Sequence, residues 1–354
     1  MLKEGKVEFD DDDVFYNDRM VMNRDVTVAV AEAWSEGGAE TYVDGMSASG
    51  IRGMRIAKET GLEPVLNDRS ENAVEKIREN LELNDLDSSV ERSDANVLFH
   101  RERFDVVDVD PFGSPIPFAD SAFQATRSLA CFTATDTAPL CGAHDSSLRR
   151  YFSRPLNTTY HPEMGLRTLV GSLARTAARY DIAVEPVLSH ASDHYHRTYL
   201  KVESGAKKSD ATLENLGSVR HCRNCGYRDS SEDLYASNIE CPNCGEETDT
   251  AGPLWLAELR DREFTAEVRS NLREYMDTYR RAWKMLNHLE GELDTPTHYD
   301  HHMICRRAGT NPTKLQDFLE QLRKKGYNAS KTHYSGTSFK TNADITDLTE
   351  IVLE

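Results

Sequence analysis

Short apolar runs alternate with amphipathic segments over the first 200 residues of this 354-residue chain. Runs rich in β-branched and aromatic residues are typical of buried strands, whereas apolar residues at helical spacing are typical of helices. Strands that alternate with helices favour parallel pairing through right-handed crossovers. The pattern therefore predicts an α/β protein with a doubly wound, Rossmann-like sheet. We expect strands at 40–45, 63–68, 104–110, 129–137 and 183–192, and helices at 51–60, 71–84, 120–129 and 165–180.

The rest of the chain has a different organisation. A polar stretch at 203–218 predicts an exposed hairpin or linker, and a short strand expected at 252–259 precedes a helical region at 264–291. The tail beyond residue 311 has a helix–turn–strand pattern, which suggests a small, helix-rich, winged-helix-like module. We therefore expect a second, α+β domain after the sheet. The expected domains are 1–215 and 216–354.

The charge balance is strongly acidic. Asp and Glu total 60 against 42 Lys and Arg, for a net charge of -18, and only 13 of the basic residues are lysine. An ordinary acidic enzyme could have this composition, but it is more typical of a halophile protein, whose acidic surface stays hydrated in a salt-rich cytoplasm. Acidity normally argues against a nucleic-acid partner. Concentrated salt weakens that argument, because it screens charge and reduces counterion release.

The sequence also bears on location. No run of about 18 apolar residues is present, so no membrane span is expected. The N-terminal segment lacks the apolar core of a signal peptide. We therefore expect a cytoplasmic protein without a membrane partner, and no obligate protein partner is evident.

Carboxylates stand where three of the expected parallel strands lead into the next segment. Asp44 precedes a turn of small residues, Asp68 ends the next strand, and Asp94 with Ala95 follows a polar segment. Ligands of doubly wound sheets bind beyond these carboxyl ends, where an acid can hold ribose hydroxyls or read adenine. Each feature alone could be an ordinary turn or a helix N-cap. The dinucleotide and P-loop glycine motifs are absent, so together the three features favour S-adenosylmethionine over NAD.

The sequence DPFGSP at 110–115 follows another expected strand and carries a family resemblance. With VFYNDRMVMNRD, DGMSASGIRG, TATDTAPLCG and the tail THYSGTSFKTNA, it resembles the tRNA (guanine-26,N2)-dimethyltransferase family, archaeal type. The resemblance covers nearly the whole chain. It implies a class I methyltransferase that uses S-adenosyl-L-methionine to mono- or dimethylate the N2 amine of guanosine 26 in tRNA. It also implies that Phe15 stacks on the flipped base, and that Arg24 and Arg52 hold the cofactor.

The chemistry of Asp110, Pro111 and Phe112 fits amino-group methylation independently. The exocyclic amine of guanine is a poor nucleophile, so it must be held in line with the methyl donor while acceptors take its hydrogens. Asp110 supplies a carboxylate acceptor, and Pro111 fixes the backbone so that a carbonyl can be the second. Phe112 offers a ring on which the base can stack. The motif resembles the Asp/Asn-Pro-Pro-aromatic tetrapeptide of amino-methylating enzymes, but it has only one proline.

Two alternatives stay open at this point. Because the tetrapeptide is shared, the substrate could be another amino group, such as adenine N6. A non-catalytic RNA-binding protein could also retain the fold as a scaffold, although the set of Asp68, Asp94 and Asp110 argues against that.

Four of the seven cysteines form two CxxC pairs, each followed by a glycine. The glycines allow tight knuckle turns that aim both thiolates of a pair at one ion. Four thiolates at this spacing are typical of a closed, structural zinc ribbon, here at 218–248. The expected Zn²⁺ ligands are Cys222, Cys225, Cys241 and Cys244. Whether such a ribbon also contacts tRNA stays open.

Overall fold

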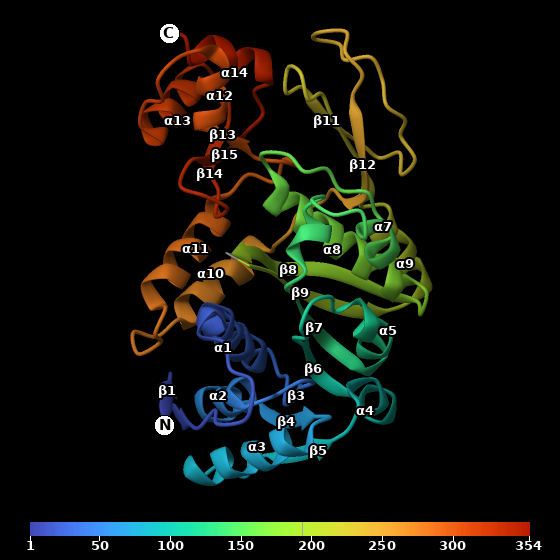
Figure 1. Ribbon diagram of the computed structural model, residues 1–354, viewed down its shortest axis with the longest axis vertical. Coiled ribbons are helices and arrows are strands. Elements are labelled where there is room, and N and C mark those ends of the chain that lie inside the picture. Colours follow the sequence, from blue (N-terminus) through green and yellow to red (C-terminus); the bar gives the residue numbers. More distant parts are fainter. Residues whose placement is uncertain (193) are drawn as a thin grey trace.

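A seven-stranded mixed sheet forms the centre of the computed structural model, which describes residues 1–192 and 194–354 (Figure 1). Its strand order is β5-β4-β3-β6-β7-β9-β8, and all neighbours pair in parallel except β9, which runs antiparallel to both β7 and β8. The α/β prediction is confirmed. The strands are β3 (Thr41–Asp44), β4 (Glu63–Asp68), β5 (Ser89–Arg92), β6 (Phe104–Val109), β7 (Thr126–Ala134), β8 (Ile182–Ser192) and β9 (Tyr195–Ser204).

Helices cover both faces of this sheet. One apolar core joins β6 and β7 to α4, α5 and α8, and a second joins the other face to α1, α2, α10 and α11. Apolar burial on both faces explains why the central strands are nearly continuous apolar runs. These helices are α1 (Val21–Glu36), α2 (Ile51–Glu59), α4 (Ala95–Arg101), α5 (Ile116–Ala125), α8 (His161–Ala178), α10 (Arg262–Asn271) and α11 (Tyr279–Gly291). The remaining elements of this part are β1 (Leu2–Glu4), β2 (Val7–Phe9), η1 (Asp18–Met20), α3 (Glu71–Leu83), α6 (Thr137–Leu140) and α7 (Ser147–Tyr151).

The polar stretch 203–218 is not the exposed hairpin or linker that the sequence predicts. It contains helix α9 (Ala206–Leu213) and the start of a strand. Ser209 and Thr212 are buried, and the Thr212 hydroxyl lies 3.3 Å from the Val184 backbone nitrogen of β8 and accepts its hydrogen bond. The prediction failed because small hydroxyl side chains can face a core when the neighbouring backbone supplies their partners.

The C-terminal segments form two smaller sheets. One is the cysteine-bearing ribbon with strand order β11-β10-β12, and the other has order β13-β15-β14 with three helices around it. The expected helix–turn–strand of the tail is confirmed as α13 followed by β14. The elements are β10 (Leu216–His221), β11 (Arg228–Ser231), β12 (Asp249–Trp255), β13 (Tyr299–Asp300), α12 (His301–Ala308), α13 (Leu315–Lys324), β14 (Ala329–Lys331), β15 (Ser338–Thr341) and α14 (Ile345–Ile351). In the described part of the chain, no helix is both long and apolar enough to cross a membrane.

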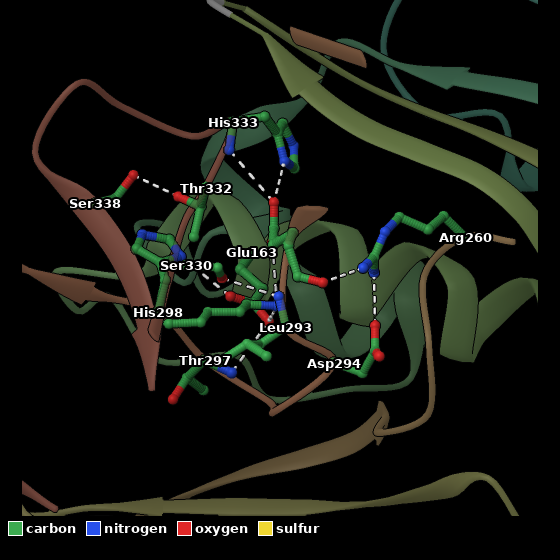
Figure 2. Close-up of polar contacts among 12 residues, drawn as sticks. Glu163, Arg260, Leu293, Asp294, Thr297, His298, Ser330, Thr332, His333 and Ser338 are labelled. Carbon is green, nitrogen blue, oxygen red and sulfur yellow. Dashed lines mark hydrogen bonds and ion pairs between the residues drawn. The ribbon is translucent and has the colours of Figure 1, made fainter. Parts of the chain in front are cut away.

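A buried network, here called the joint cluster, connects α8 to the C-terminal segments (Figure 2). It consists of Glu163, Glu292, His298, His333 and Lys340. Lys340 Nζ lies 3.0 Å from Glu163 and 3.1 Å from Glu292, so one ammonium bridges two carboxylates. His298 Nδ1 lies 3.0 Å from Glu163, and His333 Nδ1 lies 3.0 Å from Glu292. The network therefore fixes the tail against the helix that covers the central sheet.

Candidate active site

The carboxyl ends of β3, β4 and β6 open into a pocket of about 780 Å³. Parallel strands bring their carboxyl ends to one edge, which is where ligands of such sheets bind. All ten residues that the sequence nominated for catalysis or cofactor binding line this one pocket. They are Phe15, Arg24, Asp44, Arg52, Asp68, Asp94, Ala95, Asp110, Pro111 and Phe112.

The turn after β3 brings backbone close to the pocket. A Cβ at Gly45 would lie 2.7 Å from the Phe99 ring and 3.0 Å from the Asp108 carbonyl oxygen, so only glycine fits there. Gly50 has φ +81°, a left-handed conformation that glycine adopts at little cost, and α2 begins at the next residue. The glycines noted in the sequence therefore have steric and conformational reasons, and they let the turn pack closely on the core beneath it.

Asp44 is a buried carboxyl at the base of the pocket. Burial raises its pKa to about 7, an effect that the Arg52 charge opposes and that the nearby Asp108 and Asp110 reinforce. Its Oδ2 accepts a hydrogen bond from the Gly53 backbone nitrogen at 3.2 Å. A carboxyl with this pKa gains strongly from a cationic ligand, because its own surroundings do not fully neutralise it.

Asp68 and Asp94 hold the backbone that surrounds them. Asp68 accepts hydrogen bonds from the backbone nitrogens of Ala48 and Ser70, at 3.0 and 2.9 Å, which ties β4 to the turn after β3. Asp94 is the N-cap of α4 and accepts from the Asn96 nitrogen at 2.9 Å. The capping role that the sequence left open for Asp94 is therefore real, and it coexists with a position at the pocket wall.

Asp108 and Asp110 leave β6 with different partners. Asp108 is fully buried and accepts both ends of the Arg197 guanidinium, at 2.8 and 2.6 Å. Burial acts to raise its pKa, but the charges of Arg197 and Arg52 outweigh burial and leave it lowered. Asp110 lies at the pocket and is ion-paired with Arg52. We call Asp44, Arg52, Asp108, Asp110 and Arg197 the pocket cluster.

The Arg52 side chain is held from three sides. Besides Asp110, its Nη1 donates to Asn23 Oδ1 at 2.9 Å and to Thr27 Oγ1 at 3.0 Å. Both partners belong to α1, so this helix positions the guanidinium that in turn orients the Asp110 carboxylate. A guanidinium with this many fixed partners is pre-organised.

The Arg24 guanidinium is engaged by an acid of the N-terminal strand. Its Nε and Nη2 donate to Glu4 at distances down to 2.6 Å, and Nη2 also donates to the Asn17 carbonyl oxygen at 3.1 Å. The guanidinium also lies 5.0 Å from the centre of the Tyr16 ring. Arg24 therefore secures the segment that carries Phe15, in addition to lining the pocket.

Phe15 and Phe112 form an exposed aromatic pair at the mouth of the pocket. Their ring centres are 4.2 Å apart with the planes at 71°, and the side chains are 49% and 74% exposed. A base stacked between two rings needs roughly 7 Å, twice the spacing of adjacent bases in one strand. The two rings must therefore separate before a base can enter between them.

The loop that carries Phe112 is tied to the end of β7. The Gly113 nitrogen donates to Thr135 Oγ1 at 2.7 Å, and the Thr135 nitrogen donates to the Gly113 carbonyl at 2.9 Å. The next residue, Asp136, accepts hydrogen bonds from Tyr151 and Arg150 of α7. These bonds fix the position of the loop relative to the sheet edge.

Sequence reasoning missed the contribution of the ends of β8 and β9 that face each other. His194 and Tyr195 line the pocket, and His194 lies 3.2 Å from Arg19. The strand β9 was not predicted, because its buried positions include His196, Arg197 and Thr198. The aromatic and β-branched residues of 195–202, which are Tyr195, Thr198, Tyr199 and Val202, were the signal that could have revealed it.

The four cysteines of the two CxxC pairs come together as the sequence predicts. Their sulfur atoms all lie within 4.8 Å of one another. After each pair a glycine with positive φ, Gly226 or Gly245, donates its backbone N–H to the carbonyl of the first cysteine of that pair at 2.9 Å. The arrangement offers four thiolates to one ion, which is the donor set of a structural zinc site.

Comparison with known proteins identifies relatives over nearly the full length. The family described as N2,N2-dimethylguanosine tRNA methyltransferase matches residues 2–353. A tRNA (guanine(26)-N(2))-dimethyltransferase of Haloarcula marismortui is 51% identical over 96% of this chain and 93% of the relative. The corresponding protein of Halobacterium salinarum is 49% identical over 97% of this chain and 94% of the relative. Both are halophilic archaea, in agreement with the predicted salt adaptation.

The structural comparison agrees. Trm1 from Pyrococcus horikoshii, solved in complex with S-adenosyl-L-methionine, superposes with a TM-score of 0.89 at 35% identity and covers 99% of both chains. The resemblance inferred from the sequence is thus confirmed: this chain belongs to the N2,N2-dimethylguanosine tRNA methyltransferase family.

Proposed function

We propose that this chain transfers methyl groups from S-adenosyl-L-methionine to the N2 amine of guanosine 26 in tRNA, and that two transfers give N2,N2-dimethylguanosine. The observation that carries the proposal is the single pocket lined by all ten nominated residues, in a chain of this family. When bound, the cofactor supplies an electrophilic methyl group on a positively charged sulfur. The residues of the chain bind, orient and accept protons.

In this proposal, residues at the ends of different strands bind different parts of the cofactor. Asp68 accepts hydrogen bonds from the ribose hydroxyls. Asp94 and the Ala95 backbone nitrogen form hydrogen bonds with adenine. Gly45 allows the turn after β3 to pack closely on Phe99 at this edge of the sheet, since a side chain there would collide with that ring. Asp44 faces the positively charged amino group, which supplies the cation that this buried carboxyl lacks.

Two arginines complete the proposed cofactor site. Arg52 and Arg24 attract the methionine carboxylate, and Arg52 also orients Asp110 through their ion pair. Because Nε and Nη2 of Arg24 are bonded to Glu4 and Asn17, Nη1 is the atom left for this contact within the described part of the chain.

Asp110 is the proposed catalytic acceptor. Its carboxylate accepts a hydrogen bond from the guanine amine, which localises the nitrogen lone pair and aligns it with the methyl carbon. A monomethylated amine retains one hydrogen, so the same acceptor can serve the second transfer. Pro111 presents a backbone carbonyl as a further acceptor.

Phe15 and Phe112 form the proposed base sandwich. The target base must leave its helical stack to reach the donor. Stacking on an aromatic ring contributes roughly 1–3 kcal/mol per base. Entry of the base between the rings replaces the ring–ring contact at the pocket mouth.

We also propose a structural Zn²⁺ on Cys222, Cys225, Cys241 and Cys244. Four clustered sulfur atoms and the two glycine knuckles support it. Metal analysis of the purified protein should find one zinc per chain, and Cys241→Ser should lose it together with order in the ribbon. Retention of the metal by Cys241→Ser would contradict the assignment.

We also propose a domain boundary between residues 215 and 216 and a cytoplasmic location. The boundary falls between α9 and β10. Helices α10 and α11 nevertheless pack on the same face of the sheet as α1, so the second domain completes the core of the first. A tRNA-modifying enzyme works where tRNA is, which favours the cytoplasm.

Nucleoside mass spectrometry tests the reaction. Unmodified tRNA transcript is incubated with purified protein and S-adenosylmethionine in concentrated potassium chloride. We expect N2-methyl- and N2,N2-dimethylguanosine, absent when position 26 is not guanosine. Methylated adenosine would replace the substrate with adenine N6, and no methylation by folded protein would favour a non-catalytic RNA-binding protein.

Asp110→Asn is the matching variant. We expect turnover to fall about 10²–10⁴-fold, the range for loss of a positioned proton acceptor, while the calorimetric affinity for S-adenosylmethionine stays nearly unchanged. Asp68→Ala should do the reverse and weaken cofactor binding most. Equal loss of both properties in Asp110→Asn would show that its role is structural.

A further inference from the structure

A second cleft, of about 770 Å³, adjoins the active-site pocket. It lies between the start of α8, helix α11 and the segment 332–336, and Tyr195 lines both hollows. Tyr195 therefore forms part of the boundary between the cleft and the pocket. A ligand in the cleft therefore lies next to the active-site pocket on the side of Tyr195.

The charge of this cleft contrasts with the rest of the molecule. The chain has 60 acidic residues and a net charge of -18. Among the described residues that line the cleft, none is Asp or Glu, although Glu292 lies 3.0 Å from Nδ1 of the lining residue His333; Asp193, next to Ser192 in the sequence, lies outside the description. The ionisable nitrogen-bearing lining residues are His161, His196, Arg281, Lys284, His288 and His333.

Helix α11 supplies half of these groups from one stripe. Arg281, Lys284 and His288 are spaced three and four residues apart, which places them on one face of the helix. Its opposite side buries Leu286 and Leu289 in the core against α1. The packing of the apolar side therefore fixes the direction in which the basic stripe points.

Lys284 is exposed and has no ion-pair partner within the described residues. Burial, and then the positive charges of Lys284 and Lys331, lower the pKa of His288. His288 is therefore a neutral hydrogen-bond donor at neutral pH.

We propose that this cleft binds the sugar–phosphate backbone of the tRNA next to the target guanosine, with Lys284 and His288 as direct contacts. The inference rests on the proposed function and adds the surface that holds the substrate. The exposed ammonium of Lys284 and the imidazole N–H of His288 match phosphate oxygens, whereas the aromatic rings at the pocket mouth match a base. Backbone binding in the cleft would hold the strand while the base enters the pocket.

The test is a charge reversal with a matched control. Lys284→Glu and Lys207→Glu change the net charge equally, and Lys207 is an exposed residue of α9, on the far side of the molecule from α11 (Figure 1). Binding of a tRNA transcript and of S-adenosylmethionine is measured for the full chain over a range of potassium chloride concentrations at which circular dichroism shows it folded.

For Lys284→Glu we expect a dissociation constant for tRNA about tenfold higher at the lowest of these concentrations, and a slope of log affinity against log salt reduced by about 1. The cofactor affinity should not change. His288→Ala should weaken tRNA binding in the same direction. Lys207→Glu should behave like the unmodified protein.

Equal tRNA affinities for Lys284→Glu and Lys207→Glu would overturn the proposal. So would loss of cofactor binding in Lys284→Glu, because the residue would then act on the pocket rather than on RNA. These results are independent of the methylation product. Failure of the proposed reaction appears instead in the mass spectrum of the unmodified enzyme.

Discussion

Two of the buried charge clusters among the described residues, the joint cluster and the pocket cluster, differ in how well they are balanced. In the joint cluster the carboxylates Glu163 and Glu292 share Lys340, and Arg167 adds a second cation 2.9 Å from Glu163. In the pocket cluster three carboxyls face two guanidiniums. The pKa of Glu292 is accordingly lowered to about 2, with burial opposed by Lys340 and His333, whereas that of Asp44 is raised to about 7.

The difference separates a structural cluster from a binding cluster. Buried ions that serve only the fold must find all their partners within the chain, because an uncompensated buried charge is costly. The pocket cluster keeps one carboxyl in excess, and it does so at the open edge of the sheet. Such an imbalance is expected where a ligand brings the missing positive charge.

Removing a partner from the balanced cluster should have the largest effect on stability. Glu163→Gln leaves Lys340 and Arg167 buried with too little negative charge, and we expect a loss of about 3–5 kcal/mol in the free energy of unfolding. Denaturant unfolding in concentrated salt measures it. Glu203→Gln, in an exposed ion pair with Lys208, is the control and should change nothing measurable. A mild Glu163→Gln phenotype would mean that the joint is not needed for stability.

Neutralising Asp44, the carboxyl in excess in the pocket cluster, should raise the free energy of unfolding rather than lower it. The folded pKa of Asp44 lies above its ordinary value, so the folded state holds a proton that the unfolded state has lost between about pH 4 and 7, and stability falls over that range as pH rises. Asp44→Asn should remove this fall, which is on the order of 4 kcal/mol. The variant should be more stable than the parent at pH 8 and yet bind S-adenosylmethionine more weakly. Loss of stability at pH 8 would remove the contrast between the clusters.

The loss of stability at low pH, here called the acid limb, should depend on the joint cluster. Because the folded pKa of Glu292 is about 2, its contribution is complete above about pH 4.5 and disappears as pH falls toward 2. Glu292→Gln should flatten this limb by on the order of 3 kcal/mol. Unfolding curves at pH 5 and pH 3 measure about 2 kcal/mol of this change. An unchanged acid limb would assign acid sensitivity to other carboxylates.

The sequence indicated the residues that line the active-site pocket far better than those of the joint cluster. Asp44, Asp68 and Asp110 could be placed because each follows a recognisable strand, and parallel strands end at one edge. Glu163 and Lys340 are far apart in the sequence, and no local pattern connects them. Their contact depends on how the tail docks on α8, which only the folded chain determines.

The same reasoning explains the error in strand content. Arg197 interrupts the apolar pattern of β9. It can nevertheless be fully buried, because Asp108 accepts hydrogen bonds from both of its terminal nitrogens. A pattern based on hydrophobicity treats such a residue as exposed. The missing partner lay 89 residues away, so the strand could be recognised only through its neighbour.

The facing ends of β8 and β9 have a consequence for how this protein can change over evolutionary time. Ala191 donates to His333 of the tail, Ser192 accepts from Arg281 of the cleft, and His194 contacts Arg19 at the pocket. One short stretch of chain therefore contacts the tail, the cleft and the pocket. A substitution there is selected for cofactor, RNA and tail at once, so we expect variation to accumulate elsewhere first. A chimera that takes its tail from a relative would need that relative's hairpin as well.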